Sequence, residues 1–120
     1  MKVVYIAHPV GGNVKENLEK IRLIIRNINH LNEDILPFAH YWVECHALDD
    51  SVPEERERGI KNNTELFKRG FIDELWLYGD KISKGMREEV ELAHELGIPV
   101  IPQTFNTKQA YYFYDTHLFE

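Results

Sequence analysis

The chain alternates between short apolar runs and longer segments in which apolar positions follow a helical repeat. Residues 2–7, KVVYIA, combine β-branched and aromatic side chains and end at HPVGGN, a pattern typical of a buried strand followed by a glycine loop. Residues 14–31 place an apolar side chain every three or four positions among charged ones, which predicts an amphipathic helix. These apolar positions are Val14, Leu18, Ile21, Ile25 and Ile28.

The same two patterns continue along the chain. Residues 34–39 predict a second strand, residues 73–79 a third and residues 98–102 a fourth. Between the second and the third, the sequence SVPE from Ser51 has the form of a capping box with a proline in the first turn. It predicts a helix that runs to about Lys68.

A further helix is expected from near Gly85, and an acid lies at an unusual place in it. Because a helix turns about 100° per residue, Glu89 falls within an apolar stripe. The stripe consists of Met86, Val90, Ala93 and Leu96. A buried carboxylate must be hydrogen-bonded or protonated. Glu89 is therefore either a functional acid near a helix start, where open α/β sheets keep their sites, or a structural acid that reaches the rim or pairs with an arginine.

Strands that alternate with helices indicate an α/β fold. We predict a flavodoxin-like or Rossmann-like three-layer sandwich with a parallel sheet of four or five strands, formed by one domain over residues 1–120. Right-handed crossovers give the strand order 2-1-3-4 and bring the loops after strands one and three to one edge. Gly11 and Gly12 would then lie close to Glu89, in a loop that either offers N–H groups to an anion or sugar hydroxyl or merely turns the chain.

The charge balance narrows the class of partner. Twenty Asp and Glu against 14 Lys and Arg give a net charge of −6 at pH 7, which argues against a nucleic-acid polymer, since such binding depends on clustered basic residues. The one cysteine, Cys45, cannot form an intramolecular disulfide. The sequence has no signal-type or membrane-spanning apolar run. We expect a cytoplasmic protein with no membrane partner.

Residues 40–50 are dense in polar aromatic and titratable side chains. His40, Cys45, His46 and Asp49 could be drawn as metal ligands, but their spacing matches no zinc pattern. We predict no metal ion and no organic cofactor, and interpret the segment as a lid or a pocket wall. The end of the chain is also aromatic, which favours docking on the core or on a neighbouring subunit and hence a homo-oligomer. Its aromatic residues are Tyr111, Tyr112, Phe113, Tyr114 and Phe119.

Two parts of the chain resemble the nucleoside 2-deoxyribosyltransferase-like superfamily, and most closely its small phage and bacterial members. One is YIAHPVGG at the first predicted strand, and the other is DELWLYGDKISKGMREEVELAHELGIPV over residues 73–100. The second part is similar to the superfamily's late motif, which has Asp or Ser, one residue, Gly, three residues and the catalytic Glu, followed by Ala and G-x-P-V. The matching positions are Ser83, Gly85, Glu89, Ala93, Gly97, Pro99 and Val100.

The resemblance implies cleavage or transfer at the N-glycosidic bond of a nucleoside or nucleoside 5′-monophosphate. A glutamate attacks the anomeric carbon, and water or a second base resolves the glycosyl ester. Glu89 would be this nucleophile. The superfamily has an aspartate that holds the sugar hydroxyls and orients the nucleophile, and the matching place here is Glu65, with Asp80 as the other candidate.

The resemblance also implies which residues contact the substrate. At position 83, the transferases have an aspartate that contacts the base and the 2′-deoxynucleoside 5′-phosphate N-hydrolases have a serine that contacts phosphate. Ser83 therefore favours the hydrolases, although a serine there can equally cap a helix. Val10 stands where the hydrolases have an arginine. The expected substrate-binding residues are Tyr5, His8, Gly11, Gly12, Ser83 and Gly85.

Two other classes of function stay open at the level of the sequence. A non-catalytic nucleotide-binding protein, such as a sensor or a sequestering factor, would bind a nucleotide and release no base. An assembly or scaffold protein would use Glu89 as a structural, salt-bridged acid and would bind no nucleotide.

Overall fold

Four parallel strands form one sheet, in the order β2-β1-β3-β4. The computed structural model describes the backbone of residues 1–118 and the side chains of residues 1–113. The register places Tyr5 between Phe38 on one neighbouring strand and Leu75 on the other. The strands are β1 (Lys2–Ala7), β2 (Ile35–Phe38), β3 (Glu74–Leu77) and β4 (Val100–Pro102).

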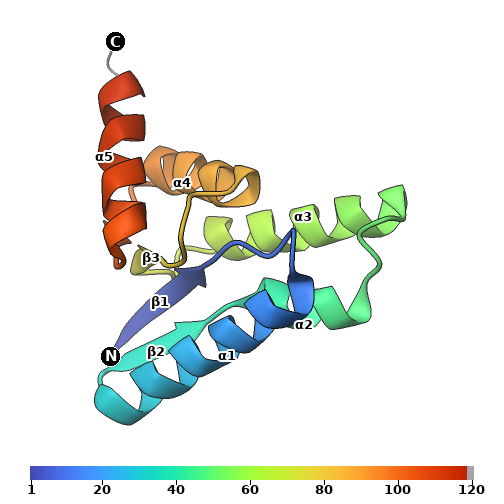
Figure 1. Ribbon diagram of the computed structural model, residues 1–120, viewed down its shortest axis with the longest axis horizontal. Coiled ribbons are helices and arrows are strands. Elements are labelled where there is room, and N and C mark those ends of the chain that lie inside the picture. The colour runs from blue at the N-terminus through green and yellow to red at the C-terminus, as the bar shows by residue number, and fades with distance from the viewer. Residues whose placement is uncertain (119–120) are drawn as a thin grey trace.

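Helices cover both faces of this sheet and complete a three-layer, flavodoxin-like α/β fold. Figure 1 shows α1 alongside β1 and β2, with α3 and α4 on the other side of the strands. The predicted fold class, strand number and strand order are confirmed. The helices are α1 (Val14–Leu31), α2 (His40–Ala47), α3 (Pro53–Lys68), α4 (Lys84–Leu96) and α5 (Phe105–Leu118).

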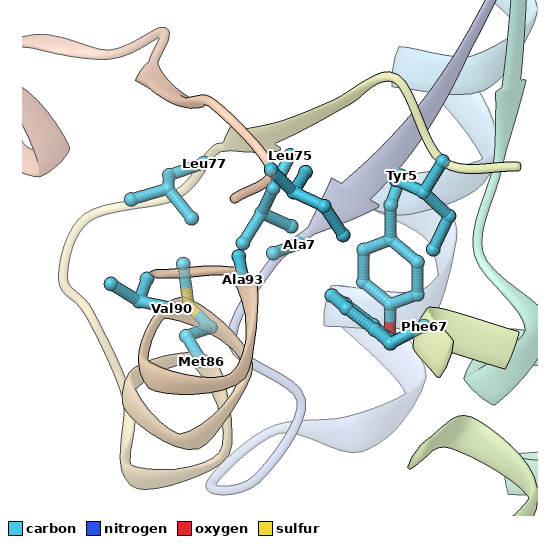
Figure 2. Packing of buried hydrophobic residues seen from close by; sticks show 10 residues of the cluster. Tyr5, Ala7, Phe67, Leu75, Leu77, Met86, Val90 and Ala93 are labelled. Carbon is cyan, nitrogen blue, oxygen red and sulfur yellow. The ribbon is translucent and has the colours of Figure 1, made fainter. Parts of the chain in front are cut away.

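Alternate residues of β1 and β3 separate two apolar layers, because successive strand side chains point to opposite faces. Val4 and Ile6 pack with Ile28 of α1 on one face. On the other face, side chains of α3 and α4 pack onto the sheet, and Figure 2 shows the α4 residues pointing towards those of β1 and β3. This second layer includes Tyr5, Ala7, Phe67, Leu75, Leu77, Met86, Val90 and Ala93, all at most 1% exposed. Each large side chain buried in this way contributes about 1.5–3 kcal/mol.

The ends of α4 are fixed by local interactions that the sequence specifies. Ser83 caps the helix, since its Oγ accepts a hydrogen bond from the Met86 N–H at 3.3 Å. Gly97 ends it with a φ of +72°, a conformation that favours glycine. With Met86 and Val90 packed on the sheet, the phase of the helix is set and Glu89 is directed towards α3.

The helix that the SVPE sequence predicts does form, but its capping box does not. Both the backbone N–H and the hydroxyl of Ser51 donate to Asp49 Oδ1, at 2.9 and 2.6 Å. This local turn takes the serine away from the helix, which begins two residues later with Val52 at the N-cap and Pro53 in the first turn. The prediction of a serine cap at position 51 was therefore wrong.

The aromatic end of the chain is helical as far as it is described. Thr104 and Thr107 cap α5 reciprocally, since each backbone N–H donates to the other residue's hydroxyl at 3.1 Å. Tyr111 packs against the core and lies 2.9 Å from His94 of α4 through its hydroxyl. The Tyr114 side chain and Phe119 lie outside the described residues, and the homo-oligomer stays a prediction. No helix within residues 1–118 is both long and apolar enough to cross a bilayer.

Candidate active site

A cleft of about 940 Å³ opens at the carboxyl edge of the sheet. Its walls come from four parts of the chain: the β1–α1 loop, α2, the middle of α3 and the first turns of α4. In this strand order the sheet reverses direction between β1 and β3, and the crevice at that point is where open α/β sheets bind ligands. The segment 40–50 contributes α2 and one wall of the cleft, as the interpretation of a pocket wall predicted.

Glu89 lies in this cleft within a hydrogen-bonded network of three side chains. Its Oε2 accepts hydrogen bonds from the Tyr5 hydroxyl and, at 3.2 Å, from Asn63 Nδ2. The Tyr5 hydroxyl is also 3.0 Å from Asn63 Oδ1. Tyr5 comes from β1, Asn63 from α3 and Glu89 from α4, so the packing of both helices on the sheet brings the three together.

The network can accommodate either protonation state of the carboxyl group. When Glu89 is ionised, Tyr5 and Asn63 both donate to it. When Glu89 is protonated, its own O–H can donate to the Tyr5 oxygen while Tyr5 donates to Asn63 Oδ1. A group with partners in both states is suited to gaining and losing charge during a reaction.

Burial raises the pKa of Glu89 to about 7, because desolvation outweighs the hydrogen bonds from Tyr5 and Asn63, which lower it. The nearby charge of Glu88 adds a smaller upward shift to this pKa. The aromatic surroundings explain the desolvation: the Tyr5 ring lies 4.8 Å from that of Phe67 and 5.8 Å from that of Tyr41. At neutral pH about half of the Glu89 carboxyl groups are therefore ionised.

His8 closes the cleft at the end of β1 and is 7% exposed. Burial lowers the pKa of its imidazole, so the ring is neutral at pH 7. Nδ1 lies 2.6 Å from the carbonyl oxygen of Pro9 and so carries the proton in the neutral ring. Nε2 is then left as a hydrogen-bond acceptor.

The predicted site residues divide into three groups. Glu89, His8, Gly11, Ser83 and Gly85 line the large cleft, and Tyr5 lies behind Glu89. Gly12 and Asp80 line a second cleft of about 580 Å³, on the side of the edge where α1 begins. Glu65 lines neither of the two clefts.

Two of the three acids expected in one site are therefore elsewhere. Glu65 projects from α3 with its side chain 58% exposed and pairs with Arg69 at 3.1 Å. Asp80 is exposed and follows β3 on the other side of the sheet edge. Because a helix turns 100° per residue, the two positions between Asn63 and Glu65 are enough to turn one into the core and the other out to solvent. Asn63 thus stands where an acid was expected.

The sequence did contain a signal for Asn63, and it is the criterion that identified Glu89. Ile60, Asn63 and Phe67 follow the spacing of three and four that marks the inner stripe of α3. A polar residue within that stripe requires a hydrogen-bonding partner. Tyr41, the other residue missed, lines the cleft with its hydroxyl donating to the Ile6 carbonyl at 2.7 Å.

Within the described residues, no group of three or more His, Cys, Asp or Glu is arranged to hold a metal ion. The comparisons with known proteins give one match. The family described as "Domain of unknown function (DUF7768)" matches residues 2–103. No curated protein and no solved structure matches the chain. The matched residues include every strand and the whole of the large cleft's lining.

Proposed function

The chain belongs to the DUF7768 family, and from its geometry we propose that it cleaves or transfers at the N-glycosidic bond of a nucleoside or nucleotide, with Glu89 as the nucleophile. The observation that carries this proposal is one carboxylate, partly withdrawn from water and held by Tyr5 and Asn63, in the wall of a cleft of ligand size. Clefts of 300–1,000 Å³ accommodate small ligands of this kind.

The chemistry requires a carboxylate that is ionised and yet weakly solvated. A solvated carboxylate is a poor nucleophile, and a fully protonated one cannot attack. The pKa of about 7 places Glu89 between these limits at neutral pH. Its position in the second turn of α4 adds the favourable dipole of the helix N-terminus.

The other side chains have separate roles in this proposal. Tyr5 and Asn63 hold the carboxylate in one orientation towards the anomeric carbon. As the glycosidic bond lengthens, the sugar takes on oxocarbenium character, which the negative charge of Glu89 stabilises. His8 Nε2, an acceptor, can take a hydrogen bond from a substrate hydroxyl or from the water that resolves the ester.

The test is release of free base from a panel of ribo- and deoxyribonucleosides and their 5′-monophosphates, followed by chromatography. Glu89→Gln keeps the shape of the side chain and removes the nucleophile, so we expect release to fall at least about 10³-fold. The matched control is Glu95→Gln, an exposed acid on the same helix, which should retain the wild-type rate.

A Glu89→Gln variant that turns over at the wild-type rate would remove Glu89 from the mechanism. Absence of base release from every substrate, together with saturable nucleotide binding that Glu89→Gln alters, would favour a non-catalytic nucleotide-binding protein of the same fold. Thermal shifts in the presence of ligand measure that binding, since a ligand at 100 times its Kd stabilises by about 2.7 kcal/mol.

A further inference from the structure

The side chains around the large cleft carry a strong excess of negative charge. Six carboxylates line it against two cations, Arg56 and Lys84, which leaves four negative charges in excess. The carboxylates are Glu44, Asp49, Asp50, Glu55, Glu88 and Glu89. The smaller cleft at the same edge has Lys20 and Lys81 against Glu16 and Asp80 and is balanced. The excess therefore belongs to the cleft of Glu89 and not to the sheet edge as a whole.

Several of these acids are held in place before any ligand arrives. The side chain of Glu44 is 12% exposed, accepts a hydrogen bond from Asn62 at 2.9 Å and lies 3.5 Å from His40. Glu55 accepts a hydrogen bond from the Asp49 backbone at 3.1 Å. Fixed charges along a concave wall focus their field into the cleft, where they attract a cation more strongly than the same charges spread over a surface.

The walls add an aromatic surface to this field. Tyr41 lines the cleft, and its ring is fixed by the hydrogen bond from its hydroxyl to the Ile6 carbonyl. A cation over a tyrosine ring gains from the ring's quadrupole as well as from nearby carboxylates. A neutral nucleobase gains little from the charges, and a 5′-phosphate is repelled by them.

Two groups that could give a proton to a departing base are already engaged. The Nδ1–H of His8 donates to the Pro9 carbonyl, and the Ser83 hydroxyl caps α4. A neutral base needs a proton as it leaves, whereas a base attached through a positively charged nitrogen does not. The field, the aromatic wall and the state of these two groups all favour the same class of leaving group.

We infer that the substrate is an unphosphorylated nucleoside whose base carries a positive charge, meaning an N-glycoside of a quaternary ring nitrogen such as a pyridinium or an N7-alkylated purine. This inference rests on the function proposed above and names the substrate class of the same site.

The reaction balances without an external acid. Glu89 bonds to the anomeric carbon while the bond from that carbon to the ring nitrogen breaks, and the electron pair of the broken bond neutralises the nitrogen. Water then attacks the anomeric carbon of the ester, the sugar keeps the hydroxyl, Glu89 recovers its carboxylate and one proton passes to solvent. The base leaves neutral, so the acidic walls no longer attract it and the product departs.

The experiment compares guanosine with 7-methylguanosine, and nicotinamide riboside with its 5′-monophosphate. Free base is measured by chromatography and proton release by pH-stat, with each kcat/KM divided by the uncatalysed rate of the same compound. We expect the cationic guanosine to exceed the neutral one by at least about 10-fold after this correction, with one proton released per base. The pyridinium riboside should exceed its monophosphate.

Charge-removing variants locate the origin of the preference. Glu55→Gln and Glu88→Gln should each lower kcat/KM for 7-methylguanosine about 3-fold and leave that for guanosine within 2-fold. Glu16→Gln, in the smaller cleft, is the matched control and should change neither. Added salt should reduce the preference for the cation.

The result that overturns the inference is a corrected kcat/KM for the neutral or the phosphorylated member that equals or exceeds that of its partner. That outcome would leave the proposed function intact, because base would still be released in a reaction that depends on Glu89. Release from no member of the panel, or release that Glu89→Gln leaves unchanged, would overturn the proposed function as well.

Discussion

The two clefts at the carboxyl edge of the sheet share His8 and Gly11, yet their charged groups are in different surroundings. In the smaller cleft, Glu16 and Lys20 form an ion pair at 3.3 Å with both side chains more than half exposed. In the larger cleft, Glu89 is surrounded by aromatic rings and hydrogen-bonded to neutral partners. Water and salt screen the first pair, so its charges have little effect on each other or on a ligand.

The comparison separates the number of charged groups from their reactivity. Both clefts contain carboxylates, but the pKa of Glu89 is raised to about 7 because its position removes water and supplies no cation in exchange. Such a position costs stability, and that cost can be measured. The four predictions below test the contrast, from the largest expected effect to the smallest.

Glu89→Gln should stabilise the protein at pH 8 and leave its stability almost unchanged at pH 4. The folded-state pKa of about 7 lies above the unfolded value of 4.5, so the folded state binds more protons and loses stability as pH rises between these two values. The full penalty is on the order of 3 kcal/mol. Denaturant unfolding of the variant and the wild type at both pH values measures it. Equal stabilities at pH 8 would mean that Glu89 is solvated.

Gly79→Ala should destabilise the fold by about 2 kcal/mol or more, because it strains the loop beside the smaller cleft. Gly79 has a φ of +100°, and an added Cβ would lie 2.5 Å from Pro9 Cδ and 3.5 Å from His8 Nε2. Gly85→Ala, in the first turn of α4, is the control: an added Cβ there meets nothing within 4 Å, so we expect no loss. Thermal unfolding compares the two variants. Equal melting temperatures would contradict the strained approach of β3 to the first loop.

Tyr5→Phe should reduce base release at pH 7 about 10-fold and move the pH–rate profile to higher pH. It removes a hydrogen bond that stabilises ionised Glu89, so the pKa of this carboxyl should rise further. The ring is retained, so the packing of the core should persist. Tyr78→Phe, on the opposite face of the sheet, is the control and should leave the profile in place. A profile that Tyr5→Phe does not move would exclude Tyr5 from the control of Glu89.

Asp80→Asn and Glu65→Gln should each change base release less than about 2-fold and stability by no more than about 0.5 kcal/mol. Both acids are exposed and neither lines the large cleft. The same release assay and unfolding curves apply. A 10-fold loss of release in Asp80→Asn would extend the active site into the smaller cleft.

Most of the fold could be read from local patterns. Residues 14–31 form a helix with the predicted ends, and the alternation of strands and helices was enough for the strand order, because crossover handedness leaves few arrangements. The segments missed were α2 and α5. No residue of α2 is buried, so it has no apolar stripe for a pattern to reveal.

The candidate site was predictable in part. An acid inside the apolar stripe of α4 pointed to Glu89, and Ser83 was expected either in the site or as a helix cap; it caps the helix and lines the cleft. Glu65 was selected by residue type, whereas the phase of α3 turns Asn63 inward instead. Asp80 was selected by its nearness in sequence to the third strand, but the loop takes it to the α1 side.

The sequence by itself determined the periodicities, and through them the sheet, its order and the helix face that holds Glu89. Only the tertiary structure decided which side chains surround that carboxylate, and therefore its pKa. Desolvation, the helix dipole and hydrogen bonds act on it in opposite directions, and their balance depends on distances between β1, α3 and α4. Those distances are set by packing between residues as far apart in sequence as Tyr5 and Glu89, which no local pattern contains.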